Sequence, residues 1–331
     1  MRILLTGAGG LLGRATATAL IERGDDVTVL QRRPAGLDCR EIRADITDEL
    51  AVRRAAAGQE AVLHLAAKVG VAGSPAEFRR VNVAGTRTVL AAARAASAAR
   101  FVQVSSPSVA HTGKPLVGAP AGPADPLTAR SDYARTKASA ELLALAADRP
   151  ELAVLAVRPH LVWGPGDTQL VGPIVARARA GRLVLVGSGA ALIDTTYIDN
   201  AVDALLAAVY AGPEIHGEAL VVSNGEPRPV GEILTRICAA AGIAGPHRTV
   251  PLPVAAAAGA VVETAWRWSR RRGDPPLTRF LAEQLGAAHW FDQRRTRQLL
   301  SWTPRIGLDD GFHRLARAGT EPAAARVPEP A

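Results

Sequence analysis

The sequence predicts an α/β fold, in which a doubly wound parallel sheet is joined to a smaller, mainly C-terminal substrate domain. Two observations predict it. Short apolar runs alternate with longer Ala- and Leu-rich helical patterns, and a glycine-rich turn directly follows the first apolar run. Near-continuous apolar runs are typical of parallel strands that crossover helices cover on both faces.

The expected strands are short and rich in Val, Ile and Leu. In chain order they are RILLT, DVTVL, REIRA, AVLHLA, FVQVSS, LAVLAVRP and EALVVS. A helix that ends near Arg23 follows the first strand, and another begins near Asp48 after the third. A turn-rich stretch follows Pro159, so EALVVS at 218–223 marks a late return of the chain to the sheet.

Composition excludes several classes of protein. The net charge of the 331 residues is +8, but only three lysines occur and the arginines are spread along the chain without a nucleic-acid-binding motif. Cys39 and Cys238 are isolated, so no metal site or redox motif is expected. No stretch of about 18 uncharged apolar residues is present, and we expect a soluble, cytoplasmic protein.

The first turn, TGAGGLLG, predicts dinucleotide binding. It places Gly7, Gly10 and Gly13 at three-residue spacing between a strand and a helix. Glycines there let the backbone approach a pyrophosphate, whose charge is met by free N–H groups and the positive end of the helix. In an alternating pattern, this turn indicates a Rossmann-type fold.

The domain boundaries follow from these elements. We assign residues 1–162 together with 191–223 to a dinucleotide-binding domain, and 163–190 together with 224–318 to a substrate domain. The final residues, 319–331, are polar and rich in Pro and Ala, and we expect them to form a disordered tail.

The end of the second strand favours NADP(H) over NAD(H). An acid there would hydrogen-bond the ribose 2′-hydroxyl and repel a 2′-phosphate. This chain has Gln31, followed by Arg32 and Arg33, whose guanidinium groups can bind phosphate in a bidentate manner. The alternative is that the arginines are solvated loop residues. Asp45 is placed to reach the adenine amino group, or else to cap the helix near Asp48.

A tyrosine and a lysine supply the catalytic hypothesis. Tyr133 and Lys137 lie four residues apart in a helical pattern, and therefore on one helix face. A nearby ammonium and a positively charged nicotinamide both favour the phenolate, so Tyr133 can exchange a proton as hydride moves. The strand FVQVSS brings Ser105 and Ser106 to the carboxyl end of the sheet, and Ser106 is expected to hold the substrate oxygen. Each serine could instead bond its own loop.

With the glycine turn, SSPS and YxxxK in this order, the chain resembles the extended short-chain dehydrogenase/reductases over about residues 1–318. The resemblance implies a catalytic trio of Ser106, Tyr133 and Lys137, in which Lys137 also binds the hydroxyls of the nicotinamide ribose. It implies a supporting role for Asn82, which could equally be a helix-start residue. The residues that it places around the cofactor are Gly7, Gly10, Gly13, Asp45, Ala66 and Ala67.

Four later segments are similar to the 3β-hydroxysteroid dehydrogenase branch of that family. They are SSPSVAH, RPHLVWGPGDTQLV, DTTYIDN and PLTRFLAEQL. The branch includes sterol-4-carboxylate 3-dehydrogenases and 2-alkyl-3-ketoalkanoate reductases. Sugar-nucleotide epimerases and dehydratases of the wider family carry an asparagine three residues after the arginine of this strand, whereas this chain has Leu161, which favours a hydrophobic substrate.

Neighbouring residues are candidates for the substrate and nicotinamide contacts. Pro159 and His160 are expected near the nicotinamide, and His160 could bind a substrate carboxylate or assist proton transfer, although a lone histidine is more often structural. Tyr197 could face the substrate or pack in the core. No metal is expected.

Two surfaces are candidates for contacts with partners. The segment 251–272 places an apolar run beside two tryptophans and a basic cluster, which suits weak contact with a membrane surface; an Ala-rich helix packing over the substrate domain explains the same residues. The family resemblance implies a homodimer, with the Ala-rich helices at 86–99 and 134–147 as candidate interface.

The expected function is NADP(H)-dependent interconversion of a ketone and a secondary alcohol on a hydrophobic substrate such as a 3-keto acid or 3-ketosteroid, in the reductive direction. Three alternatives stay open: an NAD-dependent sterol dehydrogenase, a sugar-nucleotide epimerase or dehydratase, and a non-catalytic dinucleotide sensor. The intact Tyr133 and Lys137 pair argues against the sensor.

Overall fold

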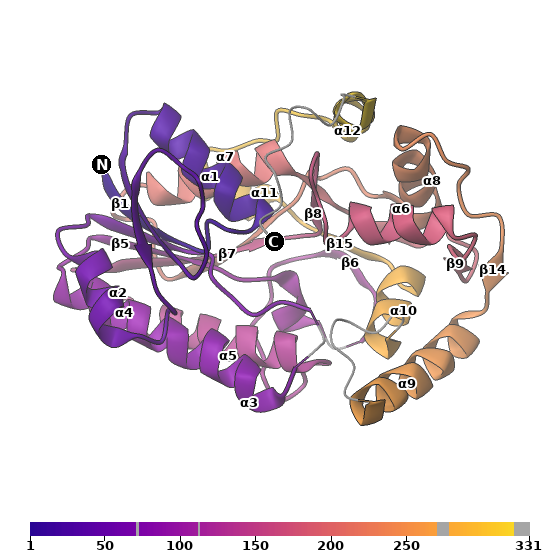
Figure 1. Cartoon of the computed structure of the whole chain (residues 1–331), viewed down its shortest axis with the longest axis horizontal. Coiled ribbons are helices and arrows are strands. Elements are labelled where there is room, and N and C mark those ends of the chain that lie inside the picture. Colours follow the sequence, from indigo (N-terminus) through magenta and orange to yellow (C-terminus); the bar gives the residue numbers. More distant parts are fainter. Residues whose placement is uncertain (71–72, 112, 270–277, 321–331) are drawn as a thin grey trace.

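The computed structural model describes residues 1–70, 73–111, 113–269 and 278–320, and its centre is a seven-stranded parallel sheet (Figure 1). The strand order is β12-β7-β5-β4-β1-β2-β3. The strands are β1 (Arg2–Thr6), β2 (Asp26–Gln31), β3 (Arg40–Arg43), β4 (Ala61–His64), β5 (Arg100–Val104), β7 (Ala153–Pro159) and β12 (Glu218–Val222). All seven predicted strands are confirmed, including the late return of the chain as β12 beside β7.

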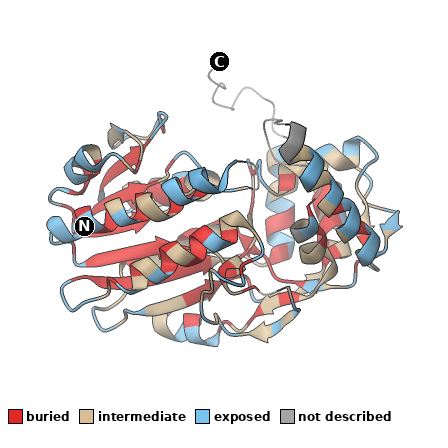
Figure 2. Ribbon diagram, turned by 90° about the horizontal axis from the view of Figure 1, so that it is seen from below, coloured by how far each residue is buried: buried red, intermediate tan, exposed pale blue. Residues whose placement is uncertain are grey.

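Helices cover both faces of this sheet. One face carries α1 (Leu11–Glu22), α7 (Ile198–Val209) and α11 (Arg294–Leu300), and the other carries α2 (Glu49–Ala56), α4 (Thr86–Ala95) and α5 (Asp132–Leu145). The central strands between them are almost wholly buried, whereas the edge strand β3 has no buried residue (Figure 2). Each layer has its own apolar core, so the doubly wound α/β class is confirmed.

The remaining elements lie beyond the carboxyl ends of the sheet strands (Figure 1). A four-stranded sheet has the order β13-β10-β15-β6, and the pairs β11-β8 and β14-β9 are separate. These short strands are β6 (Leu116–Ala119), β8 (Val162–Trp163), β9 (Leu185–Val186), β10 (Leu192–Ile193), β11 (Thr196–Tyr197), β13 (Arg228–Pro229), β14 (Thr249–Val250) and β15 (His289–Phe291). The helices here are α6 (Val171–Arg179), α8 (Val230–Ala240), α9 (Leu252–Ser269), α10 (Arg279–Gly286) and α12 (Leu308–Thr320). The exact domain boundaries stay a prediction.

The C-terminal helix corrects one boundary of the predicted tail. Helix α12 continues to Thr320, two residues into the segment 319–331. Its apolar side packs against α8 through Leu308 and Phe312, and this burial holds the last turns of the chain. The rest of the predicted tail, 321–331, lies outside the described residues.

Helix α9 has one packed side and one exposed side. Ala255 is buried, and a Cβ at Gly259 would lie 2.5 Å from the carbonyl carbon of Thr278, so α9 packs closely on the start of α10. Val254 and Val261 are exposed by 56% and 69%. Among the described residues, no helix is both long and apolar enough to cross a membrane. Residues 270–272 of the predicted membrane-contact segment fall outside the described ranges.

A fully buried ion pair fixes α5 against the sheet. Arg158, near the end of β7, and Glu141, on α5, are both completely buried. The Arg158 Nε donates to Glu141 Oε2 at 2.8 Å, and its Nη2 donates to Oε1. The remaining nitrogen, Nη1, donates to the carbonyls of Ala121 and Gly122, at 3.0 Å for Gly122. One guanidinium therefore joins a helix, a strand and the chain after β6.

We expect Glu141→Gln to lower the free energy of unfolding by about 3–5 kcal/mol, because it leaves a buried guanidinium without its counter-charge. The measurement is equilibrium urea denaturation. Arg135→Gln is the matched control, because it removes an ion pair from the exposed side of the same helix and should cost less than about 1 kcal/mol. A loss for Glu141→Gln no larger than for the control would contradict the role given to the pair.

Candidate functional site

The glycine turn after β1 has the geometry of a backbone cradle. Gly7 has φ +88°, and a Cβ there would lie 2.7 Å from the backbone nitrogen of Ala66, at the end of β4. A Cβ at Gly13 would lie 2.2 Å from the Gly7 carbonyl oxygen. Gly10 is the N-cap of α1. Only glycine lets the turn, the helix and the neighbouring strand end approach so closely, which is what pyrophosphate binding at this helix start requires.

Gln31 ends β2 with its side-chain amide buried beneath this turn. The residue is only 6% exposed, and a Cβ on Gly9 would lie 3.5 Å from its Oε1. Neither Oε1 nor Nε2 has a hydrogen-bond partner among the described residues. Buried amides are seldom left without partners, so a ligand hydroxyl beside the turn would satisfy this one. The cradle and the amide therefore fit the ribose and pyrophosphate of a dinucleotide.

Arg32 and Arg33 directly follow Gln31 and are exposed. Within the described ranges, neither forms an ion pair with an acidic residue. Their guanidinium groups are available to an anion, as the NADP(H) hypothesis requires, although the same exposure fits solvated loop residues.

Asp45 follows β3 and does not cap the next helix. Its Oδ1 accepts hydrogen bonds from the Thr47 backbone N at 3.0 Å and from the Thr47 hydroxyl at 2.8 Å, whereas Asp48 is the N-cap of α2. Burial acts to raise the pKa of Asp45, but these hydrogen bonds and the Arg80 guanidinium together lower it. Asp45 is therefore ionised near neutral pH, when it can accept a hydrogen bond from an adenine amino group.

A hydrogen-bond chain connects the segment next to the glycine turn to Asn82. Ala66 N donates to Thr6 Oγ1 at 3.2 Å, and Thr6 Oγ1 lies 2.7 Å from Nδ1 of the fully buried His64. The other ring nitrogen, Nε2, lies 3.0 Å from Thr86 Oγ1, whose hydroxyl donates to the Asn82 carbonyl. Burial and the Lys137 charge lower the pKa of His64 to about 3, so its ring is neutral. Each group in this series of hydrogen bonds therefore donates toward the Asn82 carbonyl. This chain holds the backbone of Ala66 beside the end of β1.

Asn82 lies inside a π-helical turn (Arg79–Gly85) and not at a helix start. Its Oδ1 accepts from Lys68 N at 2.7 Å, and its Nδ2 donates to the Lys68 carbonyl and to Thr136 Oγ1. The side chain therefore ties the segment after β4 to α5, next to Lys137. Such π-turns occur frequently at functional sites, and this one aims Asn82 inward.

Ser106 and Tyr133 interact at the carboxyl edge of the sheet. Ser106 follows β5 and caps a short 3₁₀ turn (Pro107–Ala110), with its Oγ 2.9 Å from Ser108 Oγ. Burial raises the pKa of Tyr133, and a hydrogen bond with the Ser106 side chain partly opposes this. Ser105 is buried, and its hydroxyl has no hydrogen-bond partner among the described residues. Of the two serines, Ser106 is therefore the one paired with the tyrosine.

Lys137 lies one turn after Tyr133 on α5 and is almost fully buried. Its Nζ donates to the Val104 carbonyl at the end of β5. Burial lowers the pKa of Lys137 to about 8, and the neighbouring Glu141 carboxylate opposes the change. The ammonium is therefore largely retained near neutral pH. The expected lowering of the Tyr133 pKa is not seen in the protein alone, because burial of the phenol dominates.

The predicted substrate residues have different surroundings. Pro159 ends β7, and His160 follows it, buried to 6% exposure, with Nδ1 lacking a partner in the described part of the chain. Tyr197 is buried in a third apolar cluster, beyond the large sheet, with its ring centroid 5.4 Å from that of Trp163, which favours a packing role for it. Leu161 is half-buried and has φ +43°, a conformation that branched apolar residues rarely adopt and asparagine tolerates. Backbone strain at such a position is a recognised mark of functional sites.

Two histidines that the sequence did not single out lie near His160. The ring centroids of His160 and His289 are 5.0 Å apart at 80°, and the charge of His111 affects the pKa of both. Sequence offers no local signal for this cluster, because its members follow or belong to β7, β15 and the 3₁₀ turn after β5.

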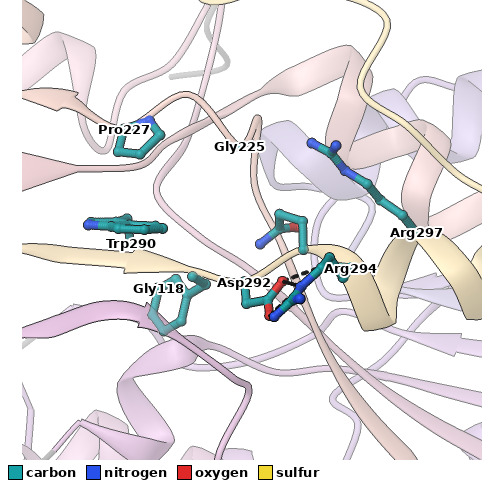
Figure 3. Close-up of a pocket in the computed structure, with 9 residues that line it drawn as sticks. Gly118, Gly225, Pro227, Trp290, Asp292, Arg294 and Arg297 are labelled. Carbon is teal, nitrogen blue, oxygen red and sulfur yellow. Dashed lines mark hydrogen bonds and ion pairs between the residues drawn. The ribbon is translucent and has the colours of Figure 1, made fainter.

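A separate cavity of about 380 Å³ lies between β6, β15 and α11 (Figure 3). Trp290 and Gly118 lie on one side of it and Arg297 on the other, while Arg294 is paired with Asp292. A Cβ at Gly118 would lie 3.0 Å from the Trp290 ring, so the glycine lets the indole pack flat. None of the three predicted catalytic residues lines this cavity.

Comparison with known proteins agrees with this geometry. The model of the NAD dependent epimerase/dehydratase family matches residues 3–223. The chain is 42% identical to a 2-alkyl-3-oxoalkanoate reductase of Stenotrophomonas maltophilia, over 95% of this chain and 98% of that protein. It is 31% identical to a 3 beta-hydroxysteroid dehydrogenase/Delta 5→4-isomerase of Mycobacterium tuberculosis, over 92% of this chain and 86% of that one.

A solved structure, MoeE5 in complex with UDP-glucose and NAD, superposes with a TM-score of 0.75 at 26% identity, covering 96% of this chain and 98% of that one. The match includes both the parallel sheet and the elements beyond it. The chain therefore belongs to the NAD dependent epimerase/dehydratase family, as an NAD(P)-binding oxidoreductase of the extended short-chain dehydrogenase/reductase type that acts on CH–OH or C=O groups.

Proposed function

We propose that the protein reduces the ketone of a hydrophobic 3-keto acid, of the 2-alkyl type, to a secondary alcohol with NADPH. The proposal is carried by one observation: Ser106, Tyr133 and Lys137 come together at the carboxyl end of β5. The chain that holds them is 42% identical to a 2-alkyl-3-oxoalkanoate reductase. The end-to-end match supports transfer of the reaction class, and the half-buried Leu161 supports an apolar substrate.

Each residue of the trio has a distinct role in this proposal. The bound cofactor supplies the hydride that adds to the carbonyl carbon. Ser106 donates a hydrogen bond to the ketone oxygen and holds it beside the phenol, and Tyr133 gives its proton to that oxygen, which leaves a phenolate and the alcohol. Lys137 stabilises the phenolate by its charge and binds the ribose hydroxyls. Burial raises the Tyr133 pKa in the protein alone, and so keeps the proton available for reduction.

The cofactor preference rests on the end of β2. Gln31 offers an amide without negative charge beneath the turn, and Arg32 and Arg33 offer two exposed cations beside it. A 2′-phosphate would gain charge-assisted hydrogen bonds there, whereas an NAD ribose would meet no carboxylate at the end of this strand. Reduction is the favoured direction because NADPH commonly drives biosynthetic reduction.

The other candidate functions predict different behaviour. A sterol dehydrogenase would oxidise a 3β-hydroxysteroid with NAD, and a sugar-nucleotide enzyme would bind a nucleoside diphosphate. Leu161 argues against the second, because an apolar side chain cannot hydrogen-bond a diphosphate.

The proposal also includes a cytoplasmic location and assembly as a homodimer. It further includes a weak membrane contact through the exposed side of α9.

The direct test is NADPH and NADH oxidation by purified protein with a 2-alkyl-3-keto acid and, separately, a 3-ketosteroid. We expect the keto acid with NADPH to give the highest kcat/KM. We also expect Tyr133→Phe to lower kcat by about 10²- to 10⁴-fold, because the proton donor is lost, with little change in NADPH binding. Full activity in Tyr133→Phe would exclude the assigned mechanism.

The cofactor preference can be tested in the double variant Arg32→Ala/Arg33→Ala. Loss of two charge-assisted contacts should raise the KM for NADPH by about 10- to 100-fold and leave the KM for NADH nearly unchanged. Arg40→Ala is the control, since Arg40 is equally exposed but lies at the opposite end of its strand from the turn. Equal effects on both cofactors would refute phosphate recognition by these arginines.

We expect Leu161→Asn to have different effects on stability, which depends on backbone strain, and on substrate binding, which depends on the apolar side chain. Asparagine adopts positive φ more readily, so the thermal stability should be unchanged or slightly higher. Loss of an apolar contact should nevertheless raise the KM for an alkyl-chain substrate by about tenfold. The checks are a thermal melt and steady-state kinetics; an unchanged KM would remove Leu161 from the substrate contacts.

A further inference from the structure

Two buried histidines from distant parts of the chain meet at the substrate side of the sheet. His160 follows β7 and His289 begins β15, and they are 6% and 2% exposed. Their rings meet edge to face, with centroids 5.0 Å apart, and Phe291 contacts His160 in the same way at 5.0 Å. Aromatic rings therefore surround His160 on two sides, and water has little access.

A hydrogen bond assigns the proton of one of the two rings. His289 Nε2 lies 2.8 Å from the Gln284 carbonyl. A carbonyl can only accept, so Nε2 of His289 carries the hydrogen and its Nδ1 presents a lone pair. Neither Nδ1 atom of the pair has a partner in the described part of the chain. Two buried ring nitrogens without partners point to a polar ligand group that would satisfy them.

His160 and Ser106 leave the large sheet from neighbouring strands. β5 and β7 are neighbours, and Ser105 N donates to the Val157 carbonyl at 2.7 Å. Ser106 follows β5 and His160 follows β7, so both leave the sheet at one edge. A substrate held by Ser106 and Tyr133 through its ketone can therefore place a nearby group toward His160.

The cations around the pair are already engaged. Arg158 is paired with Glu141, Arg130 with Glu283 at 2.7 Å, and Lys137 donates to a backbone carbonyl. A carboxylate brought to the histidines would therefore be buried without a counter-charge, which is strongly unfavourable. Protonation of an imidazole removes that penalty, because the incoming anion and the new cation neutralise each other.

The titratable surroundings of the pair keep it neutral without a ligand. Burial, the major cause, lowers the pKa of His289 to about 4 and that of His160 well below its ordinary value. His111 lowers both further, while the backbone bonds at Gln284 and Asp194 act in the opposite direction. Glu283 and Arg130 act on His111 with opposite signs. The Asp194 carboxylate accepts from Ser223 Oγ.

We infer that His160 and His289 form a proton-linked site for the carboxylate of the substrate, which takes up one proton for each acid bound. This inference rests on the proposed function and deepens it, because it says why a keto acid would be preferred to a neutral ketone. The site holds acid and proton as a neutral pair. Affinity for the acid therefore falls as pH rises, by up to about tenfold per pH unit, whereas affinity for a neutral analogue does not.

Calorimetry of the NADPH-loaded protein tests this without turnover. The probe is 2-hexyl-3-hydroxydecanoic acid, which is already reduced, and its methyl ester is the neutral match. Titration at pH 7 in buffers of different ionisation enthalpy counts the protons taken up. We expect about one proton for the acid and about zero for the ester. Equal uptake for both, or no uptake for the acid, would overturn the inference.

Two variants assign the proton to the pair. His289→Phe keeps a ring against His160, and we expect it to weaken acid binding at least tenfold and to leave ester binding within about twofold. His160→Phe is the second variant if the first does not bind NADPH. His247→Phe, at an exposed histidine, is the control and should behave as the wild type. Unchanged proton uptake in His289→Phe or His160→Phe would refute the assignment.

Kinetics on the same preparation separate this inference from the proposed function. Reduction of both keto acid and neutral ketone with equal kcat/KM, and no proton uptake, would refute the histidine site and leave the ketoreductase intact. Proton-linked binding of the acid without reduction of any ketone would support the site and refute the proposed reaction.

Discussion

The buried ion pair between Arg158 and Glu141 is the constraint on which the arrangement of the proposed catalytic residues depends. Tyr133, Lys137 and Glu141 are spaced by four residues, so they share one stripe of α5. Glu141 anchors that stripe to β7, and Lys137 anchors it to the end of β5. These two strands hold the helix in a position in which Tyr133 lies beside Ser106, the serine that follows β5. The position of the phenol is therefore set by packing around a charge pair and not by the loops.

Arg158 also contacts the segment that leads to the histidine pair. Its third nitrogen holds the carbonyls after β6, and β6 is the strand that pairs with β15. β15 carries His289 to the ring of His160. A single buried guanidinium thus connects α5, the end of β7 and the small sheet that carries His289. Breaking it would be expected to disturb both binding and catalysis, because all three parts share one anchor.

Local patterns could predict much of this protein, and long-range contacts could not. Apolar runs predicted every strand of the large sheet, and spacing alone placed Tyr133 and Lys137 on one helix face. The spacing predicted a glycine turn that binds pyrophosphate, and the structure adds close approaches of Gly7 to Ala66 and of Gly13 to the Gly7 carbonyl, which the spacing did not reveal. The histidine cluster and the Arg158–Glu141 pair depend on which strands become neighbours, and no residue near them in sequence carries that information. Tyr197 and the end of α12 were uncertain for the same reason, since burial against Trp163 and α8 decides both.

The substrate side combines two requirements that act together. In the proposed site, the apolar side chains of Leu161 and Phe291 would favour an alkyl chain over water. In such surroundings an ionised carboxylate would be excluded, whereas a carboxylate that arrives with a proton on a neutral imidazole is not. In the inferred site, the two ring nitrogens without partners would let an acid bind among apolar groups without leaving a net charge buried there. A site lined only by apolar groups would favour neutral ketones, and one with a fixed arginine would hold the acid at every pH.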